Sequence, residues 1–177
     1  MRRPRTLLAV LGVLLVSIGA TLLVTGGSSA APTKSQAFFK KTLLADAKTT
    51  ADVKGLLSED GGFVAPDTSF EDLTGDGRSE AIVLVDSGGV GGAVALFVFS
   101  TDGEAEDSDL RVVYRSQRLY RATTEIANAE LILRTPRFAE GDDVCCPAKV
   151  VERTYAWSAA SKTLRQRTSQ ELPGPTG

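Results

Sequence analysis

The fold that we expect for this chain follows from residues 81–99, AIVLVDSGGVGGAVALFVF. Two apolar runs, Ala81 to Val85 and Ala93 to Phe99, enclose a short segment with four glycines. A strand that is apolar on both alternating faces is covered on both sides, and closely spaced glycines allow a tight turn or a bulge. The stretch therefore predicts a central β-hairpin in a sheet whose two faces are both buried.

Further strands are expected on the C-terminal side of this hairpin. Leu110 to Tyr114 alternates apolar with charged residues, and more strand-like runs lie at Leu131 to Leu133, Val150 to Trp157 and Thr163 to Arg167. The last run is so polar that we expect an edge strand, where charge opposes pairing with other sheets. Residues 36–57 show helical spacing. The chain is thus predicted to be α+β, with one mainly antiparallel sheet of about six strands and N-terminal helices packed on one face.

The N-terminus has the pattern of an export signal. Three arginines within residues 1–6 precede an uncharged, mostly apolar run from Leu7 to Val24. Arginines keep their side in the cytoplasm, and the run fits both a long signal peptide and a short membrane-spanning helix. We expect residues 1–30 to be either a cleaved signal peptide or a retained single-pass anchor. In both cases the protein works outside the cytoplasm, secreted or tethered to the membrane.

Length and composition limit the remaining possibilities. The 177 residues allow one domain, expected at residues 37–170, with a linker at 31–36 and a disordered tail at 171–177. The net charge of -2, without a basic stripe, argues against nucleic-acid binding. The chain contains no histidine, the usual general base for a serine nucleophile, so we expect a protein that is not an enzyme.

The stretch directly before the hairpin, Asp72 to Glu80, has the spacing of a short calcium loop. Oxygen ligands fall on alternate residues, and a glycine stands where the backbone must turn. A full EF-hand loop has a glutamate at its twelfth position, which here is Val83. The candidate ligands are Asp72, Thr74, Asp76, Arg78 through its carbonyl, and Glu80. Two interpretations stay open: a calcium site, or an Asx-type turn whose carboxylates accept hydrogen bonds from backbone amides.

The only two cysteines, Cys145 and Cys146, are adjacent. Neighbouring Cα atoms lie about 3.8 Å apart across a trans peptide, whereas disulfides usually span about 4.4 to 6.8 Å. Three interpretations stay open: a strained vicinal disulfide, two buried thiols, or a bridge to another chain. Asp142 and Asp143 disfavour a reactive thiolate, and two adjacent thiols without histidine offer too few ligands for zinc.

The calcium-type loop resembles those of FG-GAP and VCBS-type repeats in extracellular proteins. Those loops recur in every blade of a propeller, whereas this one occurs once, so we do not expect a propeller.

Together with the Cys-Cys-Pro motif, residues 70–160 resemble a set of bacterial secreted proteins and lipoproteins of unknown function. Their pattern is an Asp-x-x-Gly-Asp-Gly-x-x-Asp/Glu loop, a hydrophobic strand, a Gly-Gly turn, Gly-Asp-x-x-Cys-Cys-Pro and an aromatic strand. The matching residues are Asp72 to Glu80, Gly88-Gly89, Gly141 to Pro147, and Tyr155 with Trp157. The resemblance implies no activity, and this chain lacks the lipid-attachment cysteine of the lipoproteins.

These observations predict an exported binding or structural module with one cation loop, for which calcium is the expected ion. The first alternative is a redox-responsive protein that uses Cys145 and Cys146. The second is a metal-dependent hydrolase that uses Asp72, Asp76 and Glu80. The only partner that the sequence indicates is the membrane, through residues 1–30 if they are retained.

Overall fold

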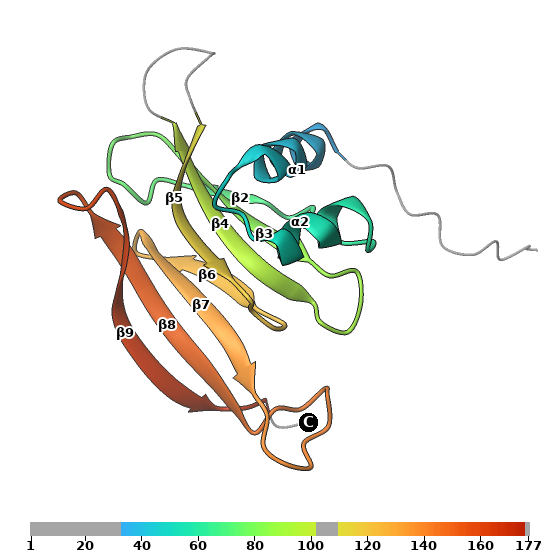
Figure 1. Ribbon diagram of the computed structural model, residues 1–177. Coiled ribbons are helices and arrows are strands. Elements are labelled where there is room, and N and C mark those ends of the chain that lie inside the picture. The colour runs from blue at the N-terminus through green and yellow to red at the C-terminus, as the bar shows by residue number, and fades with distance from the viewer. Residues whose placement is uncertain (1–32, 102–109, 176–177) are drawn as a thin grey trace, which may run out of the picture. The chain divides into compact units, whose positions relative to one another are not determined.

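The hairpin predicted at residues 81–99 lies at the centre of the fold (Figure 1). In this computed structural model, β3 (Glu80–Asp86) pairs antiparallel with β4 (Ala93–Thr101). Both strands belong to a five-stranded sheet, in which β1 (Phe63–Val64), β3, β4 and β5 (Leu110–Gln117) lie side by side in this order. β2 (Ser69–Glu71) also pairs with β3, at the end of that strand opposite to β1.

The structure describes residues 33–101 and 110–175, which belong to a unit that is distinct from residues 1–31. The apolar run from Leu7 to Val24, and with it the predicted signal peptide or anchor, lies outside the described residues. No helix within 33–101 or 110–175 is both long enough and apolar enough to span a membrane.

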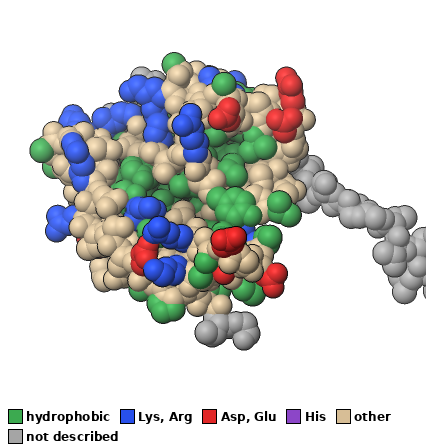
Figure 2. Space-filling model, turned by 60° about the horizontal axis from the view of Figure 1, so that its bottom comes forward, with side chains coloured by type: hydrophobic (Ala, Val, Ile, Leu, Met, Phe, Trp, Pro, Cys, Tyr) green, Lys and Arg blue, Asp and Glu red, His purple; other side chains and the backbone are tan. Residues whose placement is uncertain are grey.

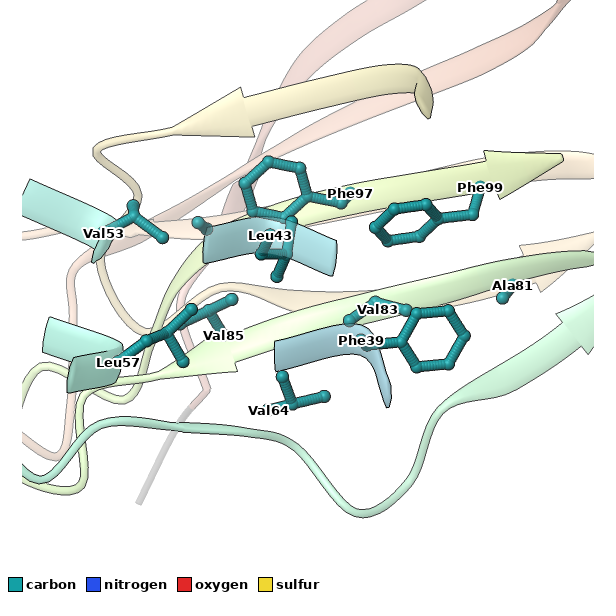
Figure 3. Close-up of a cluster of buried hydrophobic side chains, with 11 residues drawn as sticks. Phe39, Leu43, Val53, Leu57, Val64, Ala81, Val83, Val85, Phe97 and Phe99 are labelled. Carbon is teal, nitrogen blue, oxygen red and sulfur yellow. The ribbon is translucent and has the colours of Figure 1, made fainter. Parts of the chain in front are cut away.

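Two helices cover one face of the five-stranded sheet. α1 (Lys34–Ala45) and α2 (Ala51–Ser58) each begin after a threonine whose hydroxyl accepts a hydrogen bond from the first turn. Their apolar side chains meet the odd-numbered residues of β3 and β4 (Figure 3). The buried residues of this layer are Phe39, Leu43, Val53, Leu57, Val64, Ala81, Val83, Val85, Ala95, Phe97 and Phe99.

A second, four-stranded sheet covers the opposite face. Its antiparallel strands follow the order β6 (Thr123–Ala127), β7 (Glu130–Arg137), β8 (Lys149–Ser158) and β9 (Thr163–Pro173). Ile82 of β3 and Leu96 and Val98 of β4 pack against this sheet, together with Ala93 at the beginning of β4. The buried residues of this layer are Leu73, Ile82, Ala93, Leu96, Val98, Val113, Ala122, Leu131, Leu133, Tyr155 and Leu164.

The α+β class and the helices on one face are confirmed, but the prediction of a single sheet of about six strands was wrong. All six predicted strands exist, and they are divided between two sheets. The chain changes sheets between β5 and β6, where Arg118 and Arg121 have positive φ angles of 66° and 46°. The apolar pattern of a strand shows that both its faces are covered, but not whether a helix or a sheet covers them.

Two element boundaries also differ from the prediction. α1 begins at Lys34, inside the predicted linker, because Thr33 and Gln36 form a reciprocal capping box. β9 is the expected edge strand, but it continues to Pro173, inside the predicted tail, because its last residues pair with the beginning of β8.

Truncation of two adjacent residues of β4 tests the three-layer arrangement. Leu96 and Phe97 are both 0% exposed, one toward each neighbouring layer. Leu96→Ala should lower the free energy of unfolding by about 2–5 kcal/mol and Phe97→Ala by about 3–5 kcal/mol, because each leaves a cavity. Phe70→Ala is the control, since Phe70 is 55% exposed and should contribute much less. Chemical denaturation measures all three variants, and a large loss for only one of the two neighbours would contradict the arrangement.

Candidate functional site

Glu80 is the buried anchor of the loop between β2 and β3. Its side chain is among the fully buried ones, at 1% exposure. The backbone amides of Leu73 and Thr74 donate to one carboxylate oxygen at 2.9 and 3.0 Å, and the Ser100 hydroxyl donates to the other at 2.9 Å. These bonds replace the hydration that the carboxylate loses on burial.

The other two carboxylates hold the exposed part of the loop. The amides of Gly75 and Gly77 donate to Asp72 at 2.7 and 2.9 Å, and both glycines have positive φ. The amide and the guanidinium of Arg78 donate to Asp76, each at 2.9 Å. The side-chain hydrogen bond from Arg78 holds the pKa of Asp76 below its usual range. This is the geometry of an Asx-type turn.

The predicted metal ligands Asp72, Thr74, Asp76, Arg78 and Glu80 therefore do lie in one loop, with their carboxylates directed to hydrogen-bond donors of the protein. In the part of the chain that the structure describes, no group of three or more His, Cys, Asp or Glu side chains is arranged to hold a metal ion. Calcium binding by this loop stays a prediction.

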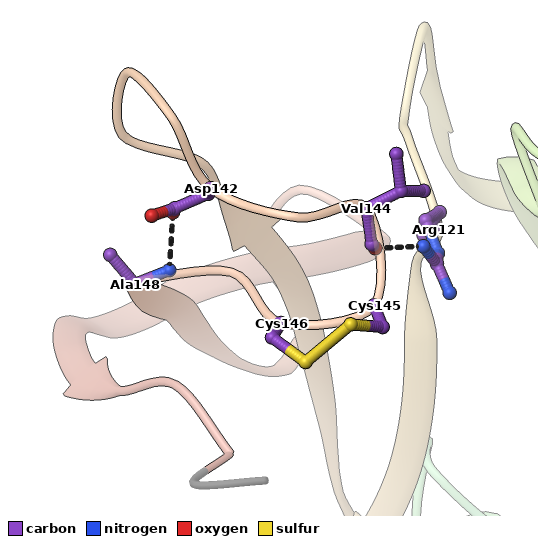
Figure 4. The surroundings of a disulfide bond; sticks show 6 residues. All are labelled: Arg121, Asp142, Val144, Cys145, Cys146 and Ala148. Atoms are coloured by element: carbon purple, nitrogen blue, oxygen red, sulfur yellow. Dashed lines mark hydrogen bonds between the residues drawn. A yellow bond between two sulfur atoms is a disulfide. The ribbon is translucent and has the colours of Figure 1, made fainter.

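The cysteine pair lies at the opposite end of the hairpin from this loop (Figure 1). The carbonyl of Gly91, in the turn between β3 and β4, accepts a hydrogen bond of 2.8 Å from the amide of Arg121. The guanidinium of Arg121 in turn donates to the carbonyl of Val144, next to Cys145 (Figure 4). The Asp72 loop and the acidic residues beside the cysteines are thus kept apart by the length of the central strands.

Residues 138–148, named here the Cys loop, connect β7 to β8. The amides of Ala139 and Ala148 donate to the Asp142 carboxylate at 2.7 and 2.6 Å, which closes the neck of the loop (Figure 4). Gly141 turns the chain with a φ of 89°, a conformation that side-chain-bearing residues rarely adopt. The carboxylate of one aspartate, Asp142, therefore holds the two ends of the loop together.

Cys145 and Cys146 form a disulfide within this loop (Figure 4). The peptide bond between them is trans, with 3.8 Å between the Cα atoms, and both residues are exposed. The sequence leaves three interpretations open, and the structure contains the first of them, the vicinal disulfide. Both cysteines therefore lie at the surface rather than in a core.

A pocket of about 210 Å³ lies beneath the Cys loop, on the outward face of the second sheet. Outward-facing side chains of β6, β7 and β8 form its floor: Thr123, Arg134, Pro136 and Val150. Its walls come from the Cys loop, the connection between β5 and β6, and the C-terminal segment: Phe138, Val144, Cys145, Pro147, Arg121 and Pro175. Most of the lining is apolar, and the disulfide forms part of it.

The two arginines of the pocket have different electrostatic environments. Arg134 forms ion pairs with Glu125 at 2.6 Å and with Glu152 at 2.7 Å, and Glu152 also accepts from Gln170. The hydrogen bonds to Glu125 and Glu152 raise the pKa of Arg134, and those from Gln170 and Arg134 lower the pKa of Glu152. Arg121 forms no ion pair within the described residues. The hydrogen bond that its guanidinium donates goes to a neutral carbonyl.

Sequence reasoning identified the cysteines but missed this pocket. No spacing pattern connects Arg121, Phe138 and Pro175, which different parts of the chain supply. The tripeptide centred on Gly174 was one feature of the sequence that could have indicated this pocket. A Cβ at this glycine would lie 1.7 Å from the Pro147 carbonyl oxygen, so a larger residue would push the C-terminal segment away from the Cys loop.

Comparisons with known proteins give no match: no family model, no curated protein and no solved structure is significantly similar to this chain. The resemblance to bacterial secreted proteins therefore rests on the sequence motifs alone.

Glu80→Ala should destabilise the protein even without calcium. The substitution leaves two amides and one hydroxyl buried without their acceptor, which should cost about 3 kcal/mol of unfolding free energy. Asp76→Ala is the control in the same loop and should leave the denaturation midpoint nearly unchanged, because its carboxylate is exposed. Both variants are denatured in excess chelator and in millimolar calcium. A loss for Glu80→Ala that appears only in calcium would favour a cation site over a loop held by its own amides.

Proposed function

We propose that this chain is a non-enzymatic binding module that works outside the cytoplasm and holds a small ligand in the pocket beneath the Cys loop. The observation that carries the proposal is the pocket itself, because residues from two connections, the C-terminal segment and one sheet converge on it. The export pattern of the N-terminus supports the location. A disulfide also persists better in such an oxidising compartment than in the cytoplasm.

Hydrogen bonds and covalent rings hold the walls of this pocket in position. Asp142 closes the neck of the Cys loop, Arg121 holds the Val144 carbonyl, and the amide of Gly174 donates to the carbonyl of Ala148 at 2.9 Å. The rings of three prolines and the disulfide further restrict the conformations that the lining residues can adopt. A preorganised site loses little conformational entropy when a ligand binds, so even a small contact area gives useful affinity.

The chemistry of the lining supports binding rather than catalysis. The ten described residues around the pocket include no carboxylate, lysine or tyrosine. Arginine stays protonated at physiological pH and cannot act as a base, and the Thr123 hydroxyl has no base beside it among these residues. What the pocket offers a ligand is apolar surface, one hydroxyl and positive charge.

A variant in which a larger side chain fills the pocket tests the binding proposal. Val150→Phe places a ring on the pocket floor, whereas Val90→Phe adds the same volume at a turn residue that is 81% exposed. Ligand-observed NMR of the full-length protein with small neutral, anionic and cationic ring compounds should detect binding of at least one class. Val150→Phe should lose the signal and Val90→Phe should keep it. Absence of binding for every class, or binding that Val150→Phe leaves unchanged, would contradict the proposal.

The exposed disulfide supports thiol–disulfide redox response as a second candidate function. A thiolate of a dithiol reductant can attack one sulfur to form a mixed disulfide, which the second thiol of the reductant then resolves. The products are the two thiols of Cys145 and Cys146 and the oxidised, disulfide form of the reductant. Because Cys145 lines the pocket, reduction would also alter one wall of the binding site.

Intact mass after alkylation measures this redox step. The untreated native protein should bind no alkylating reagent, and after a small dithiol it should gain two alkyl groups while its circular dichroism stays unchanged. The expected cause is the exposure of both cysteines, which lets the reductant reach the sulfurs without unfolding. Resistance to reduction below denaturing conditions would contradict the redox candidate, and it would leave the binding proposal intact.

A further inference from the structure

We infer that the pocket beneath the Cys loop binds an aromatic carboxylate, with its ring against the apolar lining and its anion paired with the guanidinium of Arg121. The inference rests on the proposed binding function and adds the chemical class of the ligand. Three properties of the pocket lead to it: its volume, its apolar surface and the guanidinium of Arg121, which forms no ion pair within the described residues.

The volume fits one substituted ring. A cavity of about 150 Å³ accommodates benzene, and sites for drug-sized molecules begin at about 300 Å³. The pocket of about 210 Å³ lies between these sizes. A six-membered ring with one small substituent therefore matches this volume.

The lining is suited to a ring rather than to a polyol. Three prolines, two valines, Phe138 and Cys145 line the pocket and make most of its surface apolar. Phe138 is held edge to face by Tyr120, with 5.8 Å between ring centroids. Aromatic ligands make favourable contacts with such rings and with sulfur. A sugar would have to bury several hydroxyls that find few hydrogen-bond partners here.

The charge of the pocket comes from Arg121. Arg134 is compensated by two glutamates, so it attracts a further anion only weakly. A guanidinium carries five N–H donors, and the bond to the Val144 carbonyl uses one of them. The remaining donors suit a carboxylate, which arginine binds in a bidentate manner. Figure 2 shows a face of the molecule on which hydrophobic side chains are bordered by basic and acidic ones.

The experiment compares three probes on the full-length protein at pH 7 and low salt: benzoate, its neutral isostere benzamide, and glucose. Titrations followed by amide chemical shifts should place benzoate at residues 138–150. Benzamide should bind about tenfold more weakly, because it lacks the charge-assisted hydrogen bonds to arginine. Glucose should not bind measurably.

Variants assign the charge effect to one side chain. Arg121→Gln should reduce the affinity for benzoate about tenfold, to the level of benzamide, because it removes the ion pair. Arg118→Gln is the matched control, since Arg118 lies in the same connection, also has positive φ, and is exposed outside the pocket. It should leave both affinities unchanged. Should Arg121→Gln fail to fold, the difference between benzoate and benzamide on the unaltered protein still decides the question.

Two results would overturn the inference in distinguishable ways. Equal affinities for benzoate and benzamide, or preferential binding of glucose, would reject an aromatic carboxylate while the pocket remained a binding site. Absence of binding for all three probes would reject the carboxylate inference. If the broader set of ring compounds also failed to bind, the proposed binding function would fail with it.

Discussion

The two central strands have no face toward water, and the need to cover both faces places the other elements. Val83 and Phe97 pack beneath the helices, whereas their neighbours Ile82 and Leu96 pack against the second sheet. Full burial of one such side chain contributes about 1.5–3 kcal/mol. Loss of either covering layer would expose several of them at once. The helices and the second sheet are therefore both structural requirements.

Because the interior of the hairpin is apolar, its polar chemistry lies at its two ends. Glu80 begins β3 and satisfies the amides of the loop before it. At the other end, the Gly91 carbonyl holds the backbone of Arg121, and Arg121 holds the Cys loop. The position of the pocket thus follows from the hairpin through two successive hydrogen bonds. The first end stabilises the fold, and the second presents the surface on which the proposed ligand binds.

The proposed ligand site and the proposed redox response share one structural element. Cys145 contributes to the pocket wall and is also half of the exposed disulfide. A bound ring would cover part of the sulfur surface, and reduction would release the covalent ring that shapes the wall. Binding and reduction would therefore oppose each other if both proposals hold, because each acts on the same few atoms.

Features that depend on residues close together in the chain could be predicted from the sequence: the α+β class, six of the strands, the turn of the Asp72 loop and the adjacency of the cysteines. The division of the strands between two sheets emerged with the tertiary structure, because an apolar face does not specify what covers it. The tertiary structure also decided where side chains point. Ser100 pairs with Glu80 across twenty residues, and the pocket unites Arg121, Phe138 and Pro175 through strand register and positive φ angles, which leave no spacing pattern in the sequence.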